Sequence, residues 1–530
     1  MADEMDYVVV GAGSAGCVVA SRLAEAGSRV ALLEAGPPDR HPLIHIPAGV
    51  RSLLYNAAVN WNYSSEPEEG TGGRRIHWPR GRVLGGSSAI NGMLYVRGNP
   101  ADYDTWAQMG CRGWSYDDVL PLFRRSERYL GGDDTHRGRS GPLVVEDYRT
   151  ILPLTHRFVE AAQEAGFVLT EDYNGGRQEG VGYSQMTRNH RFRASTARTF
   201  LASARDRANL SVETEAVATR LLMEGRRCVG VAFRQAGRER TLRARREVVV
   251  SGGAVNSPHL LQVSGIGPAD HLRDIGVDVV HDLPGVGRNL SDHYVVRLVH
   301  RVRDATSINE LSRGLPLLRE IARYLTRGDG ALTFGITTAM VFCKSREELA
   351  SPDLQLLFTP ASYDPDRVLA LERQPGMTLV VCPTRPSSRG TVMATSADPL
   401  ARPAIHPRYL TSPDDLQVML AGIRHARRIL AAPSLARHSV EEMRPGLAVD
   451  GDAALEAFAR AEGTTLYHPV GTCKMGEDPM AVVDSQLRVR GVEGLRVADA
   501  SVMPVLTTGN TNAPTIMIGE KAAQMLHAAP

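Results

Sequence analysis

The sequence predicts an α/β fold whose N-terminal part is a Rossmann-like nucleotide-binding unit. Residues 7–10 read YVVV, a β-branched run suited to a buried parallel strand. Residues 11–16 read GAGSAG and open an apolar, helix-periodic segment that continues through Ala26. A second apolar run, residues 29–33, ends at Glu34. Strand, glycine turn, helix and strand in this order form the first half of a nucleotide-binding fold.

The glycines of this G-x-G-x-x-G pattern have separate physical tasks. Gly11 permits the tight turn, Gly13 lets the backbone approach a pyrophosphate, and Gly16 lets the helix pack on the strand. Ser14 and Ala15 fill the variable positions of the turn. The pattern alone is weak, because glycine-rich turns are common in loops. The flanking strand and helix make a dinucleotide site the better interpretation.

The acidic residue Glu34 follows the first glycine by about 20 residues, where the fingerprint places the acceptor for the ribose hydroxyls. Ala35 and Gly36 follow it, and the absence of a basic residue there argues against a 2′-phosphate. The motif does not distinguish NAD from FAD.

The composition excludes several classes of protein. A chain of 530 residues predicts two or more structural units. Its 61 Lys and Arg nearly balance its 59 Asp and Glu, so no net charge directs it to nucleic acid or an anionic membrane. No apolar run is long enough for a membrane span, and the acidic N-terminus lacks the pattern of a signal peptide. The six cysteines form no C-x-x-C pair, so we expect free thiols, no metal site and a cytoplasmic location.

A second glycine-rich stretch, residues 79–98, reads PRGRVLGGSSAINGMLYVRG. Its glycine pair followed by serines offers several free backbone N–H groups, as an anion-binding loop requires. A plain serine-glycine loop between two domains is the alternative interpretation.

At this stretch the sequence resembles the glucose-methanol-choline (GMC) flavin oxidoreductases, in their alcohol and choline dehydrogenase-like branch. One family signature matches residues 81–91, GRVLGGSSAIN, and a second matches residues 253–267, GAVNSPHLLQVSGIG. Further similar pieces follow in the family's order: LPGVGRNLSDH (283–293), RGTV (389–392), HPVGTCKMG (468–476), LRVADASVMP (495–504) and GNTNAPTIMIGEKAA (509–523). With the N-terminal motif, the resemblance runs from residue 5 to about residue 526.

The resemblance implies an FAD cofactor, with the ADP part on the N-terminal unit and the flavin ring against residues 85–94. Some members attach the flavin through a histidine, but Ile90 stands just before Asn91 here, so FAD should be bound non-covalently. Beyond the N-terminal motif, the cofactor contacts that the resemblance implies are Ala35, Trp61, Arg82, Val83, Gly86, Ser87, Asn91, Gly92, Met93, Leu94, Val217, Asp499, Ala500, Asn512 and Thr515.

The family interleaves two domains, and strand-like segments support the same division here. Residues 1–150, 205–296 and 465–530 are expected to form the Rossmann-like FAD-binding domain. Residues 151–204 and 297–464 are expected to form an α+β substrate domain built on an antiparallel sheet, covered by a helix over about 413–430. A further helix is expected around 314–326.

His468, in the segment TTLYHPVGTCKMG (464–476), admits several interpretations on local sequence alone. A metal site with Cys473 lacks two further ligands at a suitable spacing. A Cys473 nucleophile would need His468 to face it across a turn that contains Pro469 and Gly471, and a structural histidine is the plainer alternative. In the family, a histidine of this segment pairs with a histidine or asparagine of the last shared motif. Carried over, the catalytic pair is His468 and Asn512, and Asn510 is expected to be a turn residue.

The resemblance thus implies that His468 takes the hydroxyl proton of an alcohol, which is oxidised to an aldehyde by hydride transfer to flavin N5. Asn512 would hold the substrate oxygen. The pocket residues are expected to be Met93, Phe334, Thr338, Leu466 and Tyr467. In choline-specific relatives a glutamate binds the trimethylammonium group. Thr338 aligns with the position of that glutamate, so choline is disfavoured as a substrate.

A primary alcohol is the expected substrate. Sugar, polyol or pyridoxine-type oxidation remains an alternative, and a non-redox activity like that of hydroxynitrile lyases is a distant one. The sequence leaves open the oligomeric state and whether oxygen or a quinone or dye accepts the electrons.

Overall fold

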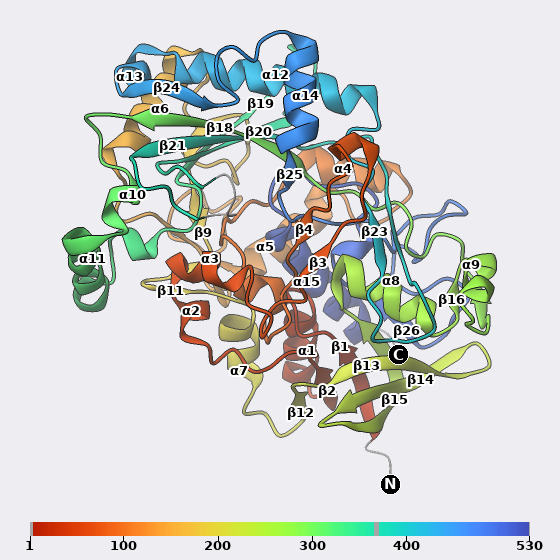
Figure 1. Ribbon diagram of the computed structural model, residues 1–530. Coiled ribbons are helices and arrows are strands. Elements are labelled where there is room, and N and C mark those ends of the chain that lie inside the picture. The colour runs from red at the N-terminus through yellow and green to blue at the C-terminus, as the bar shows by residue number, and fades with distance from the viewer. Residues whose placement is uncertain (1–3, 365–369, 529–530) are drawn as a thin grey trace.

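The structure is a computed structural model that describes residues 4–364 and 370–528. Two sheets organise it, one near the N-terminus and one at the opposite end of the molecule (Figure 1). Segments that are distant in the sequence lie side by side between the two sheets. The first helix of the chain, for example, lies beside the last one.

The first sheet has parallel strands at its centre. β1 (Glu4–Val10) lies between β2 (Val30–Leu33) and β15 (Arg238–Val250), and Val10 pairs with both Leu33 and Val250. The carboxyl ends of these strands therefore lie at one edge, where nucleotides bind in such folds. The sheet is completed by β12 (Leu210–Glu213), β26 (Leu495–Val497), β14 (Arg227–Gln235) and β13 (Val217–Glu224). The predicted Rossmann-like α/β unit is confirmed.

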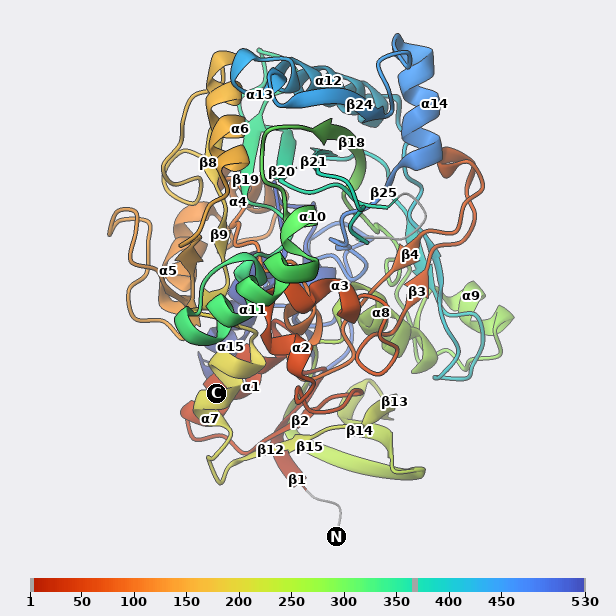
Figure 2. The same cartoon turned by 60° about the vertical axis from the view of Figure 1, so that its left-hand side comes forward.

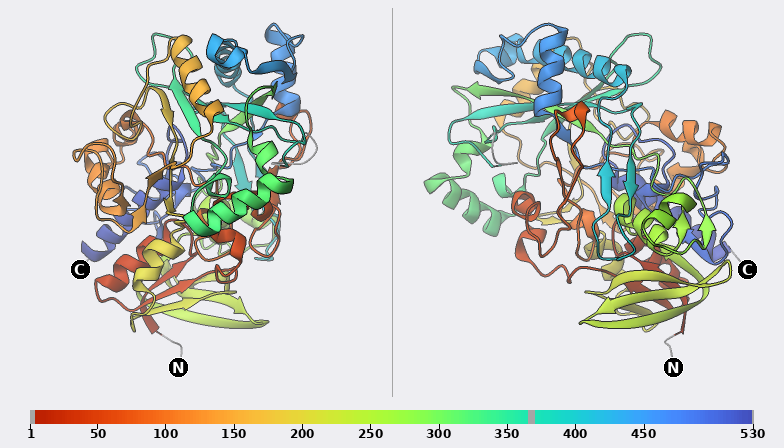
Figure 3. Two further views of the ribbon diagram at one scale, coloured as in Figure 1. Left: turned by 90° about the vertical axis from the view of Figure 1, so that its left-hand side faces the viewer. Right: turned by 45° about the vertical axis from the view of Figure 1, so that its right-hand side comes forward.

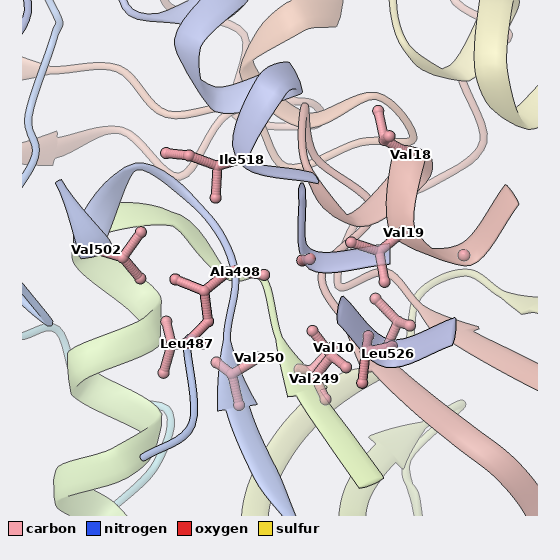
Figure 4. Packing of buried hydrophobic residues seen from close by; sticks show 14 of the residues in the cluster. Val10, Val18, Val19, Val249, Val250, Leu487, Ala498, Val502, Ile518 and Leu526 are labelled. Atoms are coloured by element: carbon pink, nitrogen blue, oxygen red, sulfur yellow. The ribbon is translucent and has the colours of Figure 1, made fainter. Parts of the chain in front are cut away.

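Two helices cover one face of this sheet. α1 (Gly16–Glu25) and α15 (Asn512–Ala528) lie so close together that a Cβ on Gly519 would be 2.9 Å from the Ala15 carbonyl oxygen. Figure 4 shows the apolar side chains of this core, with valines of β1 and β15 beneath Val18 and Val19 of α1. Burial of these branched side chains stabilises the arrangement by roughly 2 kcal/mol per residue.

The second sheet is antiparallel. Its order is β24 (Ser439–Arg444), β18 (Tyr294–Val302), β21 (Gly376–Pro383), β20 (Leu354–Thr359), β19 (Ala339–Cys343) and β8 (Gly180–Tyr183), and β25 (Thr464–Thr465) pairs with β18. The two views of Figure 3 show helices covering the outer face of this sheet. The inner face looks toward the rest of the chain.

The helix predicted over 413–430 is α12 (Pro413–Leu430), and it packs on β21. The approach is close because Gly422 has no side chain: a Cβ there would lie 2.5 Å from Val381. Leu379 and Val381 face α12 and the helices beside it, whereas Val380 between them faces inward. This alternation of a strand's side chains gives the sheet one face for its core and one for a cavity.

The remaining helices and strands are shorter or peripheral. The helices are α2 (Pro42–His45), α3 (Val50–Leu53), α4 (Pro100–Gln108), α5 (Tyr116–Ser126), α6 (Pro153–Glu164), α7 (Ala202–Ala204), α8 (Gly253–Val263), α9 (Ala269–Asp274), α10 (Ile308–Leu311), α11 (Gly314–Arg327), α13 (Pro433–Ala436) and α14 (Asp452–Glu462). The two-stranded pairs are β3 (Tyr63–Ser64) with β4 (His77–Trp78), β5 (Glu127–Arg128) with β6 (Leu143–Val144), β7 (Glu146–Asp147) with β9 (Gln185–Met186), β10 (Arg188–Asn189) with β11 (Phe192–Arg193), β16 (Ile266–Gly267) with β17 (His281–Asp282), and β22 (Thr391–Met393) with β23 (Ala404–His406).

The division into two interleaved domains stays a prediction. One of its boundaries, between residues 296 and 297, falls inside β18, a continuous strand that begins at Tyr294. No helix in the described ranges is both long and apolar enough to cross a lipid bilayer.

Candidate active site

A cavity of about 620 Å³ extends from the carboxyl edge of the first sheet to the inner face of the second. Gly13 and Glu34 lie at one end of its lining, whereas Leu357 and Val380 of the antiparallel sheet belong to the other. His468 also lines it. The cavity therefore joins the predicted nucleotide-binding motif to the predicted reacting residue.

The glycine turn leaves room for a ligand at only one of its three glycines. A Cβ on Gly11 would lie 2.5 Å from the Ser251 oxygen, and one on Gly16 would lie 1.9 Å from the Gly11 oxygen. A Cβ on Gly13, in contrast, would meet no atom within 4 Å. Gly16 is therefore a packing residue outside the cavity lining, while Gly13 offers the open backbone that a pyrophosphate requires.

Glu34 stands at the end of β2 and accepts two backbone hydrogen bonds. The Ala12 N–H donates to its Oε2 at 3.0 Å, and the Gly36 N–H donates to its Oε1 at 2.8 Å. Burial raises the pKa of Glu34 to about 7 even though these N–H groups act in the opposite direction. Each carboxylate oxygen keeps a lone pair for a ribose hydroxyl.

The second glycine-rich stretch packs directly on the first. A Cβ on Gly86 would lie 2.7 Å from the Gly13 Cα, so this approach requires glycine. Arg82 lines the cavity here with its guanidinium over the Trp61 ring, and its Nε is buried without a hydrogen-bond partner among the described residues. The Arg82 Nε–H is thus available to donate to a polar atom of a dinucleotide bound at the open glycine turn.

Two helix N-termini meet at this part of the cavity. Ser14, before α1, donates from its Oγ to Asn512 Oδ1 at 2.8 Å, and Asn512 is the first residue of α15. Asp499 lies beside them and accepts hydrogen bonds from Gly253 and Ser257. Helix N-termini carry partial positive charge, which favours the anionic groups of a dinucleotide. The residues present therefore fit FAD.

Almost all the predicted cofactor residues line this one cavity: Gly11, Gly13, Ser14, Ala15, Glu34, Ala35, Trp61, Arg82, Gly86, Ser87, Asn91, Gly92, Met93, Leu94, Val217, Asp499, Ala500, Asn512 and Thr515. Gly16 and Val83 do not. Val83 instead packs in a small apolar cluster with Ile44 and Leu53.

At the reacting end, His468 belongs to a chain of hydrogen bonds in which each imidazole accepts a hydrogen on one side and donates one on the other. Thr384 O can only accept, so His293 Nε2, 3.0 Å away, carries a hydrogen and donates it. Neutral His293 then has a lone pair on Nδ1, which accepts from His468 Nδ1 at 2.9 Å. His468 Nε2 is left with its lone pair, 3.1 Å from the Asn510 amide nitrogen. Asn510 Oδ1 in turn accepts from Gln355 at 3.4 Å, which orients that amide nitrogen toward His468.

Both imidazoles of this chain are neutral at physiological pH. Burial lowers the pKa of His293 to about 4. Burial, together with the neighbouring His293 and Arg80, holds the pKa of His468 well below its usual range. A neutral histidine whose unprotonated Nε2 lies at a cavity can accept a proton from a bound hydroxyl group that replaces the Asn510 hydrogen bond to this atom.

The backbone around His468 is fixed from both sides. Its N–H donates to Asp292 Oδ1 at 2.7 Å, while Asp292 Oδ2 accepts from Thr465 and Tyr409. Tyr467, the preceding residue, has a φ of 69°, a conformation that non-glycine residues rarely adopt. This turn directs the imidazole into the cavity.

The structure places Asn510, in place of the predicted Asn512, beside His468. Asn510 contacts His468 Nε2, whereas Asn512 faces Ser14 at the nucleotide end. Asn512 already belongs to α15, whereas Asn510 precedes that helix in an irregular, bent stretch, and the two side chains contact different groups. No local sequence signal separates two asparagines only two positions apart.

Two predicted pocket residues also lie elsewhere. Phe334 packs edge-on against Tyr148, with the ring centroids 5.4 Å apart, and Thr338 is hydrogen-bonded to Thr155 at 2.9 Å. Ile336 and Thr337, between them in the sequence, line the cavity. Met93, Leu466 and Tyr467 line it as predicted.

The sequence reasoning missed several lining residues from the antiparallel sheet. Arg297, Val380 and Leu357 are cross-strand neighbours in one row of its inner face, and Thr359 and Tyr363 lie nearby in the lining. Period-2 alternation within β18, β20 and β21 could have suggested an inward face, but it could not show that this face borders the cavity.

Two other interpretations of the 464–476 segment, a Cys473 nucleophile and a metal site, lose support. Cys473 is fully buried, and burial raises the pKa of its thiol well above the usual range, so it stays protonated. No group of three His, Cys, Asp or Glu residues in the described ranges is arranged to hold a metal ion. All six cysteines are free and buried.

Comparison with known proteins identifies relatives along nearly the whole chain. Models of the N-terminal and C-terminal parts of the GMC oxidoreductases match residues 5–295 and 386–519. An alcohol dehydrogenase (acceptor) of Pseudomonas putida is 44% identical over 98% of this chain and 95% of its own length. The mitochondrial choline dehydrogenase of Homo sapiens is 43% identical over 100% of this chain and 90% of its own.

Solved structures of the same architecture also match. Pyridoxine 4-oxidase from Mesorbium loti has a TM-score of 0.89 at 31% identity, covering 99% of this chain and 100% of its own. A fungal aryl-alcohol oxidase has a TM-score of 0.86 at 26% identity, covering 99% of both chains.

Proposed function

Because the chain belongs to the GMC oxidoreductase family, we propose that His468 is the general base with which this FAD-dependent enzyme oxidises a primary alcohol to an aldehyde. The family membership confirms the resemblance read from the sequence, and FAD is the cofactor of the enzyme. The observation that carries the proposal is the directional chain that leaves the lone pair of His468 Nε2 facing the cavity.

The hydroxyl group of the substrate lies beside the Asn510 amide nitrogen and His468 Nε2, within hydrogen-bond reach of both. Its oxygen accepts from the Asn510 amide nitrogen, and its hydrogen is donated to His468 Nε2. Proton transfer to His468 as the alcohol carbon is oxidised lowers the barrier by roughly 3–5 kcal/mol. Bound FAD supplies the hydride acceptor for the oxidation.

His293 is a positioning residue in this proposal. It is fully buried behind His468, is not in the cavity lining, and its ring is nearly perpendicular to that of His468, at 83°. By accepting from His468 Nδ1, it keeps His468 in the tautomer that has its lone pair on the cavity side. The imidazolium formed during the reaction keeps the same contact, because Nδ1 then still carries a hydrogen.

A neutral alcohol fits the reacting end better than choline does. The lining there is mainly apolar, with Ile336, Leu357 and Val380. Its described charged side chains are the cations Arg80, which donates to the Tyr467 carbonyl oxygen at 2.7 Å, and Arg297. The lining carboxylates Glu34 and Asp499 belong to the nucleotide end. A trimethylammonium group would therefore meet a like charge without a compensating carboxylate in the described lining. Oxidation of a sugar, a polyol or a pyridoxine-type alcohol is the alternative on the same scaffold.

The test is anaerobic flavin reduction, followed by stopped-flow absorbance, with neutral primary alcohols, polyols, pyridoxine and choline. We expect the neutral primary alcohols to reduce the flavin fastest and choline to be among the slowest. His468→Ala should keep FAD and slow reduction by about 100- to 10,000-fold. Reduction at the wild-type rate in His468→Ala would refute the role of His468. Absence of bleaching with every alcohol in the wild-type protein would favour a non-redox activity like that of hydroxynitrile lyases.

Reoxidation of the reduced enzyme by air, compared with a quinone or dye, then identifies the electron acceptor. A cytoplasmic location is part of the proposal as well. It is supported by the six free and buried thiols, since a reducing compartment keeps thiols in that state.

A further inference from the structure

The helix α11 (Gly314–Arg327) presents apolar side chains to solvent. Of its 14 residues only Tyr324 is fully buried, and Leu315, Leu318 and Leu325 are 70%, 61% and 63% exposed. Ala322 is also exposed. These four residues follow one another at steps of three and four, so they form one continuous stripe along the helix, here called the leucine stripe.

The helix lies at the outer edge of the molecule (Figures 1 and 2). It is held by the turn between β10 and β11, where Arg191 donates to the Leu325 carbonyl oxygen at 2.8 Å and the Tyr324 hydroxyl donates to the Arg191 carbonyl oxygen at 3.0 Å. Phe192, in the same turn, is 40% exposed. The leucine stripe thus continues toward a second exposed apolar side chain on a neighbouring element.

The border of this apolar surface is basic. Arg319 is exposed on α11, three residues before Ala322 and four after Leu315, and the guanidinium groups of Arg191 and Arg198 lie over the Phe192 ring. Within residues 4–364 and 370–528, none of these three arginines forms an ion pair with a carboxylate. The acidic side chains of the region are engaged elsewhere, since Asp329 and Glu320 contact Arg323. The surface therefore combines leucines with uncompensated positive charge.

We propose that α11 docks on an anionic lipid bilayer, with the leucine stripe and Phe192 in the boundary between headgroups and acyl chains. Helices that lie in such interfaces have one apolar face and a polar face rich in Lys or Arg. The arginines at the border reach lipid phosphates, each contributing about a fivefold increase in affinity. No described helix could span the bilayer, so this contact is a peripheral one.

A second copy of the chain is a poorer occupant of the same surface. A stable protein interface buries about 800 Å² on each partner, which three leucines, an alanine and a phenylalanine do not supply. A two-fold pairing would also bring the same uncompensated arginines of both copies together. An anionic surface complements that charge, whereas an identical surface repels it.

The docking site is connected to the cavity wall through the chain. The short helix of residues 331–333 packs against α11, and Ile336 and Thr337, which line the cavity, follow it directly.

The test is cosedimentation of the FAD-containing enzyme with vesicles of phosphatidylcholine mixed with phosphatidylglycerol, and with vesicles of phosphatidylcholine alone. We expect binding to the anionic vesicles that weakens as salt is raised. Leu315→Gln/Leu318→Gln/Leu325→Gln should weaken binding by at least about tenfold, and Arg198→Gln/Arg319→Gln should weaken it on anionic vesicles only. The readout is independent of catalysis, so it stands apart from the role of His468.

A matched control replaces three exposed leucines outside α11: Leu130→Gln/Leu169→Gln/Leu447→Gln. This variant should bind vesicles as the wild type does, and the flavin absorbance and unfolding temperature of every variant should be unchanged. Wild-type protein that stays in the supernatant at low salt would overturn the proposal. So would equal loss of binding in the control, or analytical ultracentrifugation that finds a lipid-free dimer dissociated by the α11 leucine substitutions.

Discussion

At the nucleotide end of the cavity, the site is built on backbone packed closely around Gly13, which Glu34 and the second glycine-rich stretch border. At the reacting end, the groups are side chains, and His293, Thr384, His468 and Asn510 come from four separate segments. Cofactor binding at the nucleotide end depends on open space next to the main chain. Proton transfer at the reacting end depends on which groups donate and which accept hydrogen bonds. The two ends should therefore respond differently to substitution, because a small added volume damages one and a lost donor or acceptor damages the other.

Among the substitutions that separate the two ends of the cavity, the largest effect is expected from the two asparagines, which lie only two positions apart. Asn510→Ala removes the donor to the substrate oxygen and should lower the rate of flavin reduction by about 100- to 1,000-fold. Asn512→Ala removes the contact with Ser14 and should change that rate by less than about tenfold. Anaerobic stopped-flow reduction of the two variants measures this. The reverse order would restore Asn512 as the partner of His468.

A substitution at Gly13 tests the nucleotide end. The position is open in the protein alone, so Gly13→Val should fold, but its side chain would occupy the space that the pyrophosphate needs. We expect FAD affinity to fall by about 100-fold, since overpacking a close contact costs about 3 kcal/mol. Fluorescence titration of the apoprotein with FAD measures the affinity, with His468→Ala as the control that keeps it. Unchanged affinity would contradict a pyrophosphate site at Gly13.

The orientation of His468 is tested by a matched pair at His293. His293→Leu leaves the Nδ1–H of His468 buried without an acceptor, which should slow flavin reduction by about 10- to 100-fold. His293→Gln should recover most of the rate, because its amide can both accept from His468 and donate to Thr384. A purely structural role predicts that both variants lose thermal stability and that Gln gives no recovery of the reduction rate at a temperature where both are folded.

The smallest effect concerns pH. The pKa of Glu34 is raised to about 7, so lowering the pH from 8 to 6 protonates this acceptor and should weaken FAD binding by about tenfold. The pKa of His468 is lowered, so His468 stays neutral over the same range. The acid limb of kcat/KM, measured with FAD saturating, should therefore lie below pH 6.5. An acid limb near pH 7 under those conditions would contradict a depressed pKa at His468.

Much of the fold could be predicted because its signals are local. The strand, glycine turn and helix at residues 7–26 correspond to β1 and α1, and the helix predicted over about 413–430 is α12, with Pro413 as its first residue. In these segments, neighbouring residues determine both the conformation and the buried face. The same holds for Gly13 and Glu34, whose positions follow from the turn and the strand that carry them.

The sequence by itself was enough to predict the nucleotide-binding unit, the family resemblance and the hypothesis that His468 is the base. Only the tertiary structure decided which asparagine reaches His468, that His293 stands behind it, and that Arg297 and Ile336 line the cavity in place of Phe334 and Thr338. The physical reason is that a backbone site is set by the φ and ψ angles of adjacent residues, whereas a side-chain site requires segments hundreds of positions apart to meet. Which side chains meet there depends on how the helices and the antiparallel sheet pack, and no short stretch of sequence encodes that.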